Sequence, residues 1–448
     1  MYRIEDVDNI KKNISNIQDE AHYIFKTTYE PTIGEYKQVM DCILEFIKIK
    51  KRIIYGGYAQ NQLIKIKNEN DTFYKDIDTP DVEFYSFEPI KDIIDLCDYL
   101  YEKKKFKFIQ GSEGIHDGTY KLFVNFENYC DISYISKNIC DSMKYIELNG
   151  LRYAHPDFMY IDNYRIFTDP FSFSFRLDKT FNRYLRLYKH YPIQKPHNMI
   201  LNIKQSPQKD LDLIRKKIIH KSKYIVVGKY AYNYYLSKLN IESTNIDYYE
   251  IITTNYEKNI EKINKIITKL FKNVKVKEFS AFFEFFGRRV EFYINGKLLL
   301  KVYDNNNRCI VNRFSEKKKC FFGTNQLVIL FLLSNYNYAI INHNKIEEQN
   351  NLIMLYQIIT SKNNYLDLKD KNVLDKTPFE DFIITCDGIA LDPRRESFLE
   401  RINKKKKGLR LNFKYEPLGN KITPPNYIFT NTSGNEIIND KNLIIKKY

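Results

Sequence analysis

The sequence is poor in the residues and runs that mark several classes of protein. Only 15 of its 448 residues are glycine and 13 are proline, which excludes a collagen-like fibre. Its longest apolar run, residues 327–333, has the length of a core segment and is too short to cross a bilayer. The N-terminus lacks the apolar centre of a signal peptide. We therefore expect a soluble intracellular protein with no membrane partner.

The cysteine pattern argues against a structural metal. The seven cysteines are scattered and contain no Cys-x-x-Cys pair, and the chain has no His-Glu-x-x-His segment. Structural zinc is therefore not expected, and we expect reduced, mostly buried thiols in a reducing compartment.

The chain has ample apolar material and a large positive charge. A hydrophobic content of 43% and an aromatic content of 15% support a sizeable core and exclude a disordered chain. The net charge of +15 would suit a nucleic-acid partner. Only 16 of the 71 basic residues are arginine, however, and this lysine-rich profile is typical of AT-rich coding. The charge alone therefore does not identify a partner.

Hydrophobic periodicity predicts a mixture of helices and strands. The predicted helices cover residues 35–51, 89–103, 325–338 and 345–360, and the predicted strands cover residues 52–55, 79–86, 118–126 and 129–136. We therefore expect one compact unit of helices and strands over about residues 50 to 145.

A glycine pair and three acids in this unit indicate phosphate chemistry. Gly56 and Gly57 follow a short strand, where backbone N–H groups can hold phosphate oxygens. Asp81 and Glu83 stand two apart on a predicted strand and share a face, and Asp131 lies in another strand. Each feature alone would also fit a tight turn or a solvated strand. Together they predict a nucleotidyltransferase with a pair of Mg²⁺ or Mn²⁺ ions.

A rival pair of acids has the same spacing. Asp76 and Asp78 precede Pro80, and proline is disfavoured in a central strand. We therefore favour Asp81 and Glu83.

Similar landmarks recur in the same order about 160 to 172 residues later. Gly228 follows another short strand, and a second acidic strand sets Glu250 against Asp81 and Ile252 against Glu83. Residues 289–294 align with residues 130–133. We therefore expect a duplicated domain. Because isoleucine cannot ligate a hard cation, the second copy should bind no catalytic metal.

A basic stripe is predicted on one helix. At the helical period, one narrow sector contains Arg176, Lys179, Arg183, Arg186 and His190. The other side contains Leu177, Phe181, Tyr184, Leu185 and Tyr188. Because AT-rich coding does not favour arginine, this clustering indicates contacts to RNA or phosphate rather than only a solvated face. The lysine run at residues 404–407 is expected to form a solvated loop that could also meet RNA.

The glycine turn, residues 79–86 and Asp131 together resemble the DNA polymerase β-type nucleotidyltransferase signature. Residues 153–170 and 175–183 are similar to the catalytic poly(A) polymerase of large cytoplasmic DNA viruses, of the giant-virus and poxvirus type. The resemblance covers roughly residues 50 to 300. Tyr58 stands where many members have serine or threonine, which leaves a hydroxyl contact to the triphosphate in doubt.

The resemblance implies template-independent addition of AMP from ATP to the 3′ end of mRNA, with two divalent metal ions and release of pyrophosphate. It makes Asp81, Glu83 and Asp131 the catalytic metal ligands, and Gly56 and Gly57 the ATP-phosphate turn. The cytoplasm of a virus-infected cell is the implied location. Packaging in the virion, a homodimer and a helper subunit stay open. Two alternative functions also stay open: another terminal nucleotidyltransferase, of the CCA-adding or oligoadenylate-synthesising type, and a non-catalytic RNA-binding subunit.

We therefore expect an α+β protein with tandem nucleotidyltransferase-like domains, each a mixed sheet flanked by helices, the first active and the second degenerate. The expected divisions are an N-terminal helical region (1–50), a catalytic domain (51–145), a connecting segment with the basic helix (146–210), a degenerate domain (211–300) and a C-terminal region with a basic tail (301–448).

Overall fold

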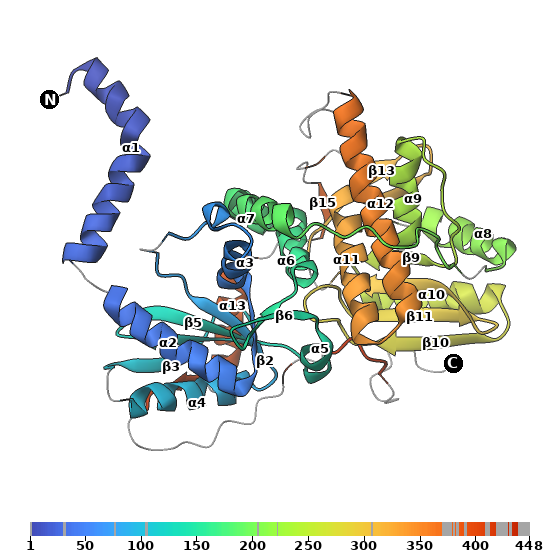
Figure 1. The fold of residues 1–448 in the computed structure, drawn as a ribbon. Coiled ribbons are helices and arrows are strands. Elements are labelled where there is room, and N and C mark those ends of the chain that lie inside the picture. Colours follow the sequence, from blue (N-terminus) through green and yellow to red (C-terminus); the bar gives the residue numbers. More distant parts are fainter. Residues whose placement is uncertain are drawn as a thin grey trace. The chain divides into compact units, whose positions relative to one another are not determined.

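The computed structural model divides the chain into two compact units (Figure 1). It describes residues 2–29, 33–75, 78–103, 106–203, 206–221, 223–305, 308–369, 379, 381, 385–388, 392–407, 413–417, 429 and 432–437. Unit 1 comprises Met1–Tyr134, Glu147–Tyr153 and Arg410–Asn426, and unit 2 comprises Ile135–Ile146, Ala154–Leu409 and Tyr427–Tyr448. Within the described ranges, no helix combines the length and apolar character needed to span a bilayer.

Unit 1 is built on a mixed sheet whose strand order is β16-β3-β4-β5-β2-β1-β7-β6. Its strands are β1 (Ile53–Tyr55), β2 (Val82–Ser86), β3 (Ile109–Glu113), β4 (Thr119–Val124), β5 (Glu127–Tyr134), β6 (Tyr145–Leu148), β7 (Leu151–Ala154) and β16 (Lys414–Tyr415). Its helices are α1 (Ile4–Ile24), a π-helical turn (Phe25–Tyr29), α2 (Ile33–Lys50), α3 (Gly56–Lys65), a 3₁₀ turn (Glu69–Asp71) and α4 (Pro89–Glu102).

The core of unit 1 lies between the sheet and the helices α2 and α4. Helix α4 begins with a proline in its first turn and buries Ile93, Cys97 and Leu100, which recur at helical spacing. Strand β4 alternates between partly exposed and buried residues, as expected for a strand with one face on the core.

Unit 2 contains a second mixed sheet, of order β10-β11-β12-β9-β8-β14-β13-β15. Its strands are β8 (Ile225–Val227), β9 (Tyr249–Thr253), β10 (Val274–Phe279), β11 (Arg289–Ile294), β12 (Lys297–Asp304), β13 (Ile310–Ser315), β14 (Cys320–Gly323) and β15 (Cys386–Asp387). Its helices are α5 (Lys137–Ser142), α6 (Pro156–Thr168), α7 (Pro170–His190), α8 (Gln208–Lys217), a 3₁₀ turn (Ile219–Lys221), α9 (Gly228–Lys238), α10 (Tyr256–Leu270), α11 (Asn325–Ile341), α12 (Lys345–Lys369) and α13 (Pro393–Lys406).

Helix α11 forms the centre of unit 2. It contains the longest apolar run of the chain and packs against α6, α9 and α12. Nearly all of its side chains are buried, which explains why its sequence is apolar on every side.

The two sheets share one topology, which confirms the predicted duplication and the α+β class. The strands β3-β4-β5-β2-β1-β7-β6 of unit 1 match β10-β11-β12-β9-β8-β14-β13 of unit 2 in order. The matched pairs also agree in direction, since both β2–β5 and β9–β12 are parallel and both β1–β2 and β8–β9 are antiparallel. Residues 289–294 form β11, the counterpart of β4, so their predicted alignment with residues 130–133 is wrong.

Two smaller predictions are also wrong. Cys309 and Cys386, with Cα atoms 5.5 Å apart, are joined by a disulfide, so the cysteines are not all reduced thiols. Three of the five remaining cysteines are buried, as expected. Residues 404–406 of the lysine run lie in helix α13 rather than in a loop.

Candidate active site

The predicted acids come from two neighbouring parallel strands of unit 1. Asp81 directly precedes β2, Glu83 lies on β2 and Asp131 lies on β5. The Cα atoms of Glu83 and Asp131 are direct partners in the parallel pairing. Because residues two apart along an extended chain point to the same side, this register brings the three carboxylates to one side of the sheet.

An asparagine and a lysine connect these acids. The side-chain amide of Asn128 donates to Asp81 Oδ2 at 3.2 Å and to Asp131 Oδ1 at 3.1 Å. The Lys121 ammonium lies 2.7 Å and 2.6 Å from the two carboxylate oxygens of Asp131. Asp81 and Asp131 therefore flank a single amide group, and one positive charge compensates part of their repulsion.

The pKa of the buried Cys130 thiol is affected by all three acids. Burial raises its pKa well above the ordinary value, and the charges of Asp131, Asp81 and Glu83 raise it further. All three carboxylates therefore contribute to the raised pKa of this one thiol.

The glycine turn lies against Glu83. Gly56 has a φ of +71°, and a Cβ atom built there would lie 1.7 Å from Glu83 Oε2. Glycine is therefore required at this position both by the backbone angle and by the carboxylate. The N–H group of Gly57, which we expected to be free for phosphate oxygens, donates to Glu83 Oε2 at 2.9 Å.

The rival pair of acids is arranged differently. Asp78 lies outside β2, and its carboxylate accepts a hydrogen bond from the backbone N–H of Lys75 at 2.6 Å. Asp76 lies outside the described residues. Within the described ranges, no three His, Cys, Asp or Glu side chains are grouped closely enough to hold a metal ion.

The corresponding turn in unit 2 corrects the predicted alignment. Gly228 has a φ of +62°, and a Cβ atom there would lie 1.8 Å from Glu250 Oε2. Val227 pairs with Glu250 as Tyr55 pairs with Glu83. Glu250 is therefore the counterpart of Glu83, and the alignment that set it against Asp81 was displaced by two residues.

This corrected register exchanges the charges of the second site. Lys301 is the partner of Glu250 on the parallel strand, in the place that Asp131 holds in unit 1. Glu291 is the partner of Lys301, in the place that Lys121 holds beside Asp131. The acid and the base have changed places between the two units.

The centre of the second site is occupied by ammonium groups. The Nζ atoms of Lys229 and Lys301 each lie 4.6 Å from the ring centroid of Tyr248, which stands where unit 1 has Asp81. Lys229 is also paired with Asp247 at 2.8 Å and is almost completely buried. Two fixed positive charges repel a divalent cation. These lysines support the prediction that the second copy binds no catalytic metal. The reason differs from the expected one, because Ile252 is not the counterpart of Glu83.

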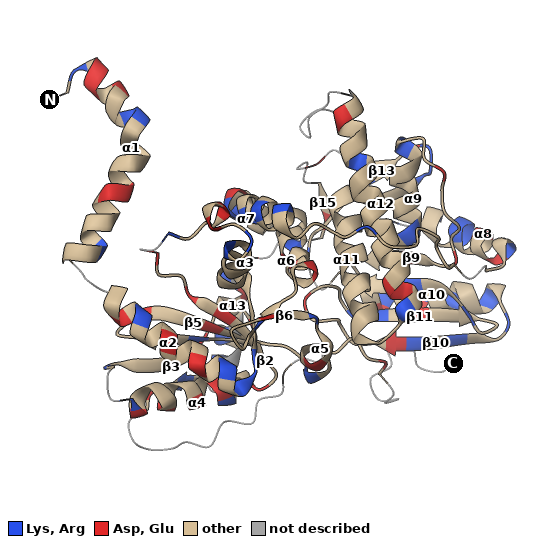
Figure 2. Ribbon diagram, in the orientation of Figure 1, with Lys and Arg blue, Asp and Glu red and all other residues tan. Residues whose placement is uncertain are grey.

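Helix α7 separates its polar and apolar faces only partly as predicted. Its first turn is capped by Asp169, which accepts from two backbone N–H groups. Lys and Arg positions lie along α7 (Figure 2), and Arg176, Lys179 and Arg186 are exposed while Arg183 is half-buried. Tyr184 packs on aromatic rings of α6. Leu185, which we placed on the buried side, is 47% exposed.

His155 has a structural role at the start of helix α6. Its Nδ1 accepts the backbone N–H of Asp157 at 3.3 Å and so caps helix α6.

Asn128 and Lys121 were not predicted as site residues from the sequence. Asn128 stands three residues before Asp131, which would place the two on opposite faces of a regular strand. The register shifts between Leu122 and Phe123, so the residue after Asn128 is skipped and both side chains reach the same side. The same shift occurs in β11 and β12, where Leu298 takes the place of Asn128.

The duplicated fold and the paired acids of unit 1 define the nucleotidyltransferase class. Two family profiles match the chain: poly(A) polymerase catalytic subunit over residues 41–173, and the C-terminal part of the mimivirus-type poly(A) polymerase catalytic subunit over residues 184–447.

Individual relatives agree with these profiles. A protein of Acanthamoeba polyphaga mimivirus assigned as a poly(A) polymerase catalytic subunit is 30% identical over 99% of this chain and 84% of its own length. An African swine fever virus protein with the same assignment is 31% identical over 37% of this chain and 35% of its own. The crystal structure of the Megavirus polyadenylate synthase superposes with a TM-score of 0.92, at 30% identity, over 99% of this chain and 94% of that one.

The chain belongs to the poly(A) polymerase catalytic subunit family. It is a viral-type transferase that adds adenylate to RNA without a template, and ATP and RNA are its substrates. The non-catalytic alternative and the other terminal nucleotidyltransferases are therefore set aside.

Proposed function

We propose that unit 1 contains the catalytic centre for transfer of AMP to the 3′ end of mRNA. The observation that carries this proposal is the strand register, in which Glu83 of β2 lies beside Asp131 of β5, together with the Asn128 amide that donates to both Asp81 and Asp131. In the reaction, the RNA 3′-oxygen forms a bond to the α-phosphorus of ATP, and the bond to pyrophosphate breaks.

The donor set fits divalent cations, Mg²⁺ or Mn²⁺, because carboxylate oxygens are hard ligands. Two such ions would activate the 3′-hydroxyl and stabilise the charge on pyrophosphate. Asp81, Glu83 and Asp131 would supply the ligands. Since Lys121 already holds Asp131 and Gly57 already holds Glu83, we infer that both contacts are given up when a cation binds.

The glycine turn and helix α7 would make the remaining contacts, to the phosphates of ATP and to RNA. The N–H groups of Gly56 and Gly57, at the start of α3, would hold phosphate oxygens of ATP once Glu83 is released. Arg176, Lys179, Arg183 and Arg186 of α7 would hold the RNA backbone or ATP phosphates.

The test replaces the acids isosterically in the full chain. Asp81→Asn and Asp131→Asn should each lower tailing of an RNA primer at least about a hundredfold, because both remove a metal ligand. Asp95→Asn, which removes an acid from the partly exposed pair with Lys50, should leave the rate unchanged. A full rate after either active-site substitution would contradict the site.

Metal binding gives a readout that does not depend on activity. Lys121→Gln removes the positive charge that competes for Asp131, so it should tighten Mn²⁺ binding in a spin-resonance titration, whereas Asp131→Asn should weaken it. Equal Mn²⁺ affinity in Lys121→Gln and the parent would show that the lysine does not compete with the cation.

We also propose that the chain forms a homodimer through α1. Spacings of three and four alternate along Val7, Ile10, Ile14, Ile17, Ala21 and Ile24, which is a coiled-coil seam. Ile14 and Ile17 are about half exposed, and no residue of α1 is buried. In a parallel pair, Asp6 would face Lys11 of the second copy.

Light scattering should give twice the chain mass for the parent and the chain mass for Ile14→Glu with Ile17→Glu. Ser15→Glu, on the other face, should stay dimeric. A monomeric parent would favour a helper subunit instead.

For location, we propose the cytoplasm of virus-infected cells, since the relatives are viral. Fractionation of infected cells and purified virions with an antibody to this chain tests both that location and packaging.

A further inference from the structure

Two neighbouring loops of unit 1 expose a pair of phenylalanine rings. Phe126 lies in the turn between β4 and β5, and Phe108 directly precedes β3. Their exposed fractions are 79% and 65%, and the two rings stack on each other with their centroids 5.1 Å apart. The pair therefore presents an aromatic surface to solvent.

Both phenylalanines have backbone angles that disfavour them. Val124 pairs with Glu127, so Asn125 and Phe126 form a two-residue hairpin turn, and their φ values of +48° and +73° are both positive, as in a type I′ turn. Glycine is the usual second residue of such a turn, whereas a bulky side chain is strained there. Phe108 has a φ of +43°. Neither ring is buried, so packing in the core does not offset this strain.

The corresponding turn of unit 2 has residues that suit the same backbone. Strands β11 and β12 are joined by Asn295 and Gly296, with φ values of +50° and +77°. Asn273 takes the place of Phe108, since its carbonyl accepts from the N–H of Asn295 as that of Phe108 accepts from the N–H of Asn125. Asparagine and glycine adopt positive φ more readily than other residues. Only unit 1 thus has phenylalanine at these two positions of the shared fold.

The phenylalanine pair lies close to the carboxylates of unit 1 along the chain. Asn128, which donates to Asp81 and Asp131, follows Phe126 by two residues. At about 3.4 Å per residue, the strand from Phe126 to Asp131 spans at most about 17 Å. Successive nucleotides of a stacked strand are about 3.4 Å apart, so this span corresponds to about five nucleotides.

The segment before β3 adds positive charge. Residues 103–108 contain four lysines, and Lys103 and Lys107 are exposed. Two exposed acids, Glu102 and Glu127, flank the aromatic residues in sequence, so the lysines outnumber them. Proteins hold single-stranded RNA with aromatic rings that stack on bases and with cations that hold phosphates. This combination favours RNA over an apolar protein surface as the partner.

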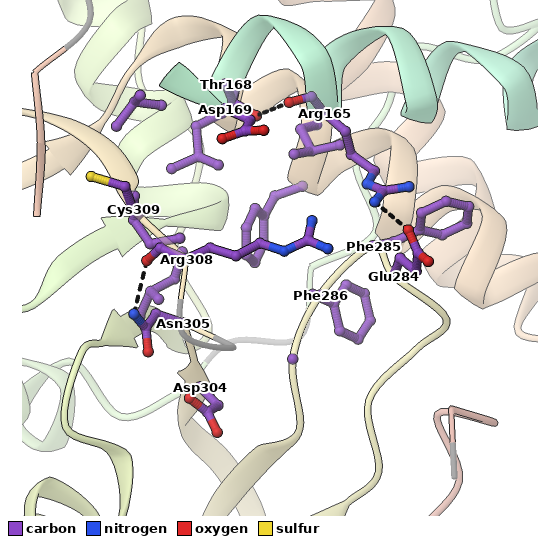
Figure 3. Close-up of a pocket in the computed structure, with 17 residues that line it drawn as sticks. Arg165, Thr168, Asp169, Glu284, Phe285, Phe286, Asp304, Asn305, Arg308 and Cys309 are labelled. Atoms are coloured by element: carbon purple, nitrogen blue, oxygen red, sulfur yellow. Dashed lines mark hydrogen bonds and ion pairs between the residues drawn. The ribbon is translucent and has the colours of Figure 1, made fainter. Parts of the chain in front are cut away.

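The pocket of unit 2 does not have this character. It lies between the end of α6, residues 284–287 and helix α11 (Figure 3). Arginines and acids are mixed along its walls, and Arg165 is paired with both Asp162 and Glu284. It therefore offers RNA no excess of positive charge.

We propose that Phe108 and Phe126 form a stacking surface for bases of the RNA primer, about five nucleotides before its 3′ end. The lysines before β3 hold the adjoining phosphates. This inference rests on the proposed function, because the acids of unit 1 fix where the 3′ end lies. Stacking tolerates any base, so the surface accepts both the body of the message and the growing adenylate tail.

Phe126→Gly tests the ring separately from the backbone. It gives the turn the Asn-Gly sequence of unit 2, so the thermal unfolding midpoint should stay level or rise. Binding of an eight-nucleotide oligoadenylate to the full chain, with a metal chelator present, should weaken about tenfold because a stacking contact is lost. Phe126→Tyr keeps the ring and should bind like the parent.

Two results would overturn the stacking surface. The first is equal oligoadenylate affinity in Phe126→Gly and the parent. The second is a lowered unfolding midpoint in Phe126→Gly, which would assign the ring a structural role.

A second measurement reports stacking directly. The chain has no tryptophan, so Phe126→Trp introduces a single indole whose emission is quenched when a base stacks on it. The eight-nucleotide oligoadenylate should quench this emission, whereas ATP at the same concentration should not. Ile49→Trp, at a position of α2 that is 65% exposed, should be quenched by neither. Quenching by ATP as strong as by the oligoadenylate would overturn the assignment to the primer.

The chelator keeps this result separate from the proposed function. Without metal, the quenching does not depend on Asp131 as a ligand. A failure of the catalytic assignment would instead show as full tailing by Asp131→Asn, in an assay that does not involve the indole.

Discussion

The two glycine turns allow one substitution to be made twice, once in each unit. In Gly56→Ala the new methyl group would overlap the Glu83 carboxylate, and in Gly228→Ala it would overlap that of Glu250. Both residues also have positive φ, at which a side chain costs roughly 1–2 kcal/mol. The two substitutions therefore have a similar backbone cost. They differ in how easily the overlapped carboxylate, that of Glu83 or that of Glu250, can move away.

Glu83 is partly exposed, so its carboxylate can rotate away from the methyl group of Gly56→Ala at the loss of the Gly57 hydrogen bond. We expect only a modest loss of stability. Misplacing a catalytic group by about 1 Å can cost on the order of a hundredfold in rate, so tailing should fall by about that factor.

Glu250 is only 3% exposed and accepts a hydrogen bond from Tyr303 at 2.9 Å. Displacing this buried charge costs roughly 3–5 kcal/mol. Gly228→Ala should therefore lower the thermal unfolding midpoint more than Gly56→Ala, yet leave the rate near that of the parent at temperatures where it is folded.

The assay pairs thermal denaturation with primer extension on the same preparations. The expected result is an opposite order in the two readouts: Gly56→Ala is the less active variant and Gly228→Ala the less stable one. Equal losses of activity in both variants would refute the assignment of catalysis to unit 1.

Three further predictions concern other parts of the chain. Arg183→Glu with Arg186→Glu should weaken RNA binding and flatten its dependence on salt, and an unchanged slope would remove α7 from the RNA contacts. Burial raises the pKa of Cys320 to about 11, so alkylation at neutral pH followed by mass spectrometry should modify Cys42 well before Cys320. Burial alone would raise the pKa of Glu291, but the neighbouring lysine and arginine charges lower it below its ordinary value. Its contribution to stability is therefore full above about pH 4.3 and is lost as pH falls through the lowered pKa, so Glu291→Gln should flatten the acid limb of a denaturation curve.

The local features of the active centre could be predicted because they depend on short segments. The Gly56-Gly57 turn, the spacing of Asp81 and Glu83, and the flanking apolar strand residues each specify a backbone conformation within a few residues. The amphipathic pattern of α7 likewise depends only on helical periodicity. The duplication could also be predicted, because the same order of turn and strands recurs along the chain.

The partners across the sheet depended on the tertiary structure. Pairing register joins residues that are far apart in the chain, and a shift of one or two positions changes which side chains meet. That is why Glu250 was set against the wrong acid, and why the bulge that turns Asn128 toward Asp131 was not foreseen. The exchange of Asp131 for Lys301 depends on the pairing of β5 with β2 and of β12 with β9. Amino-acid order by itself thus determined which elements form and where phosphate chemistry could arise, whereas folding decided which charges face one another, because electrostatic interactions depend on distances that only the assembled sheet sets.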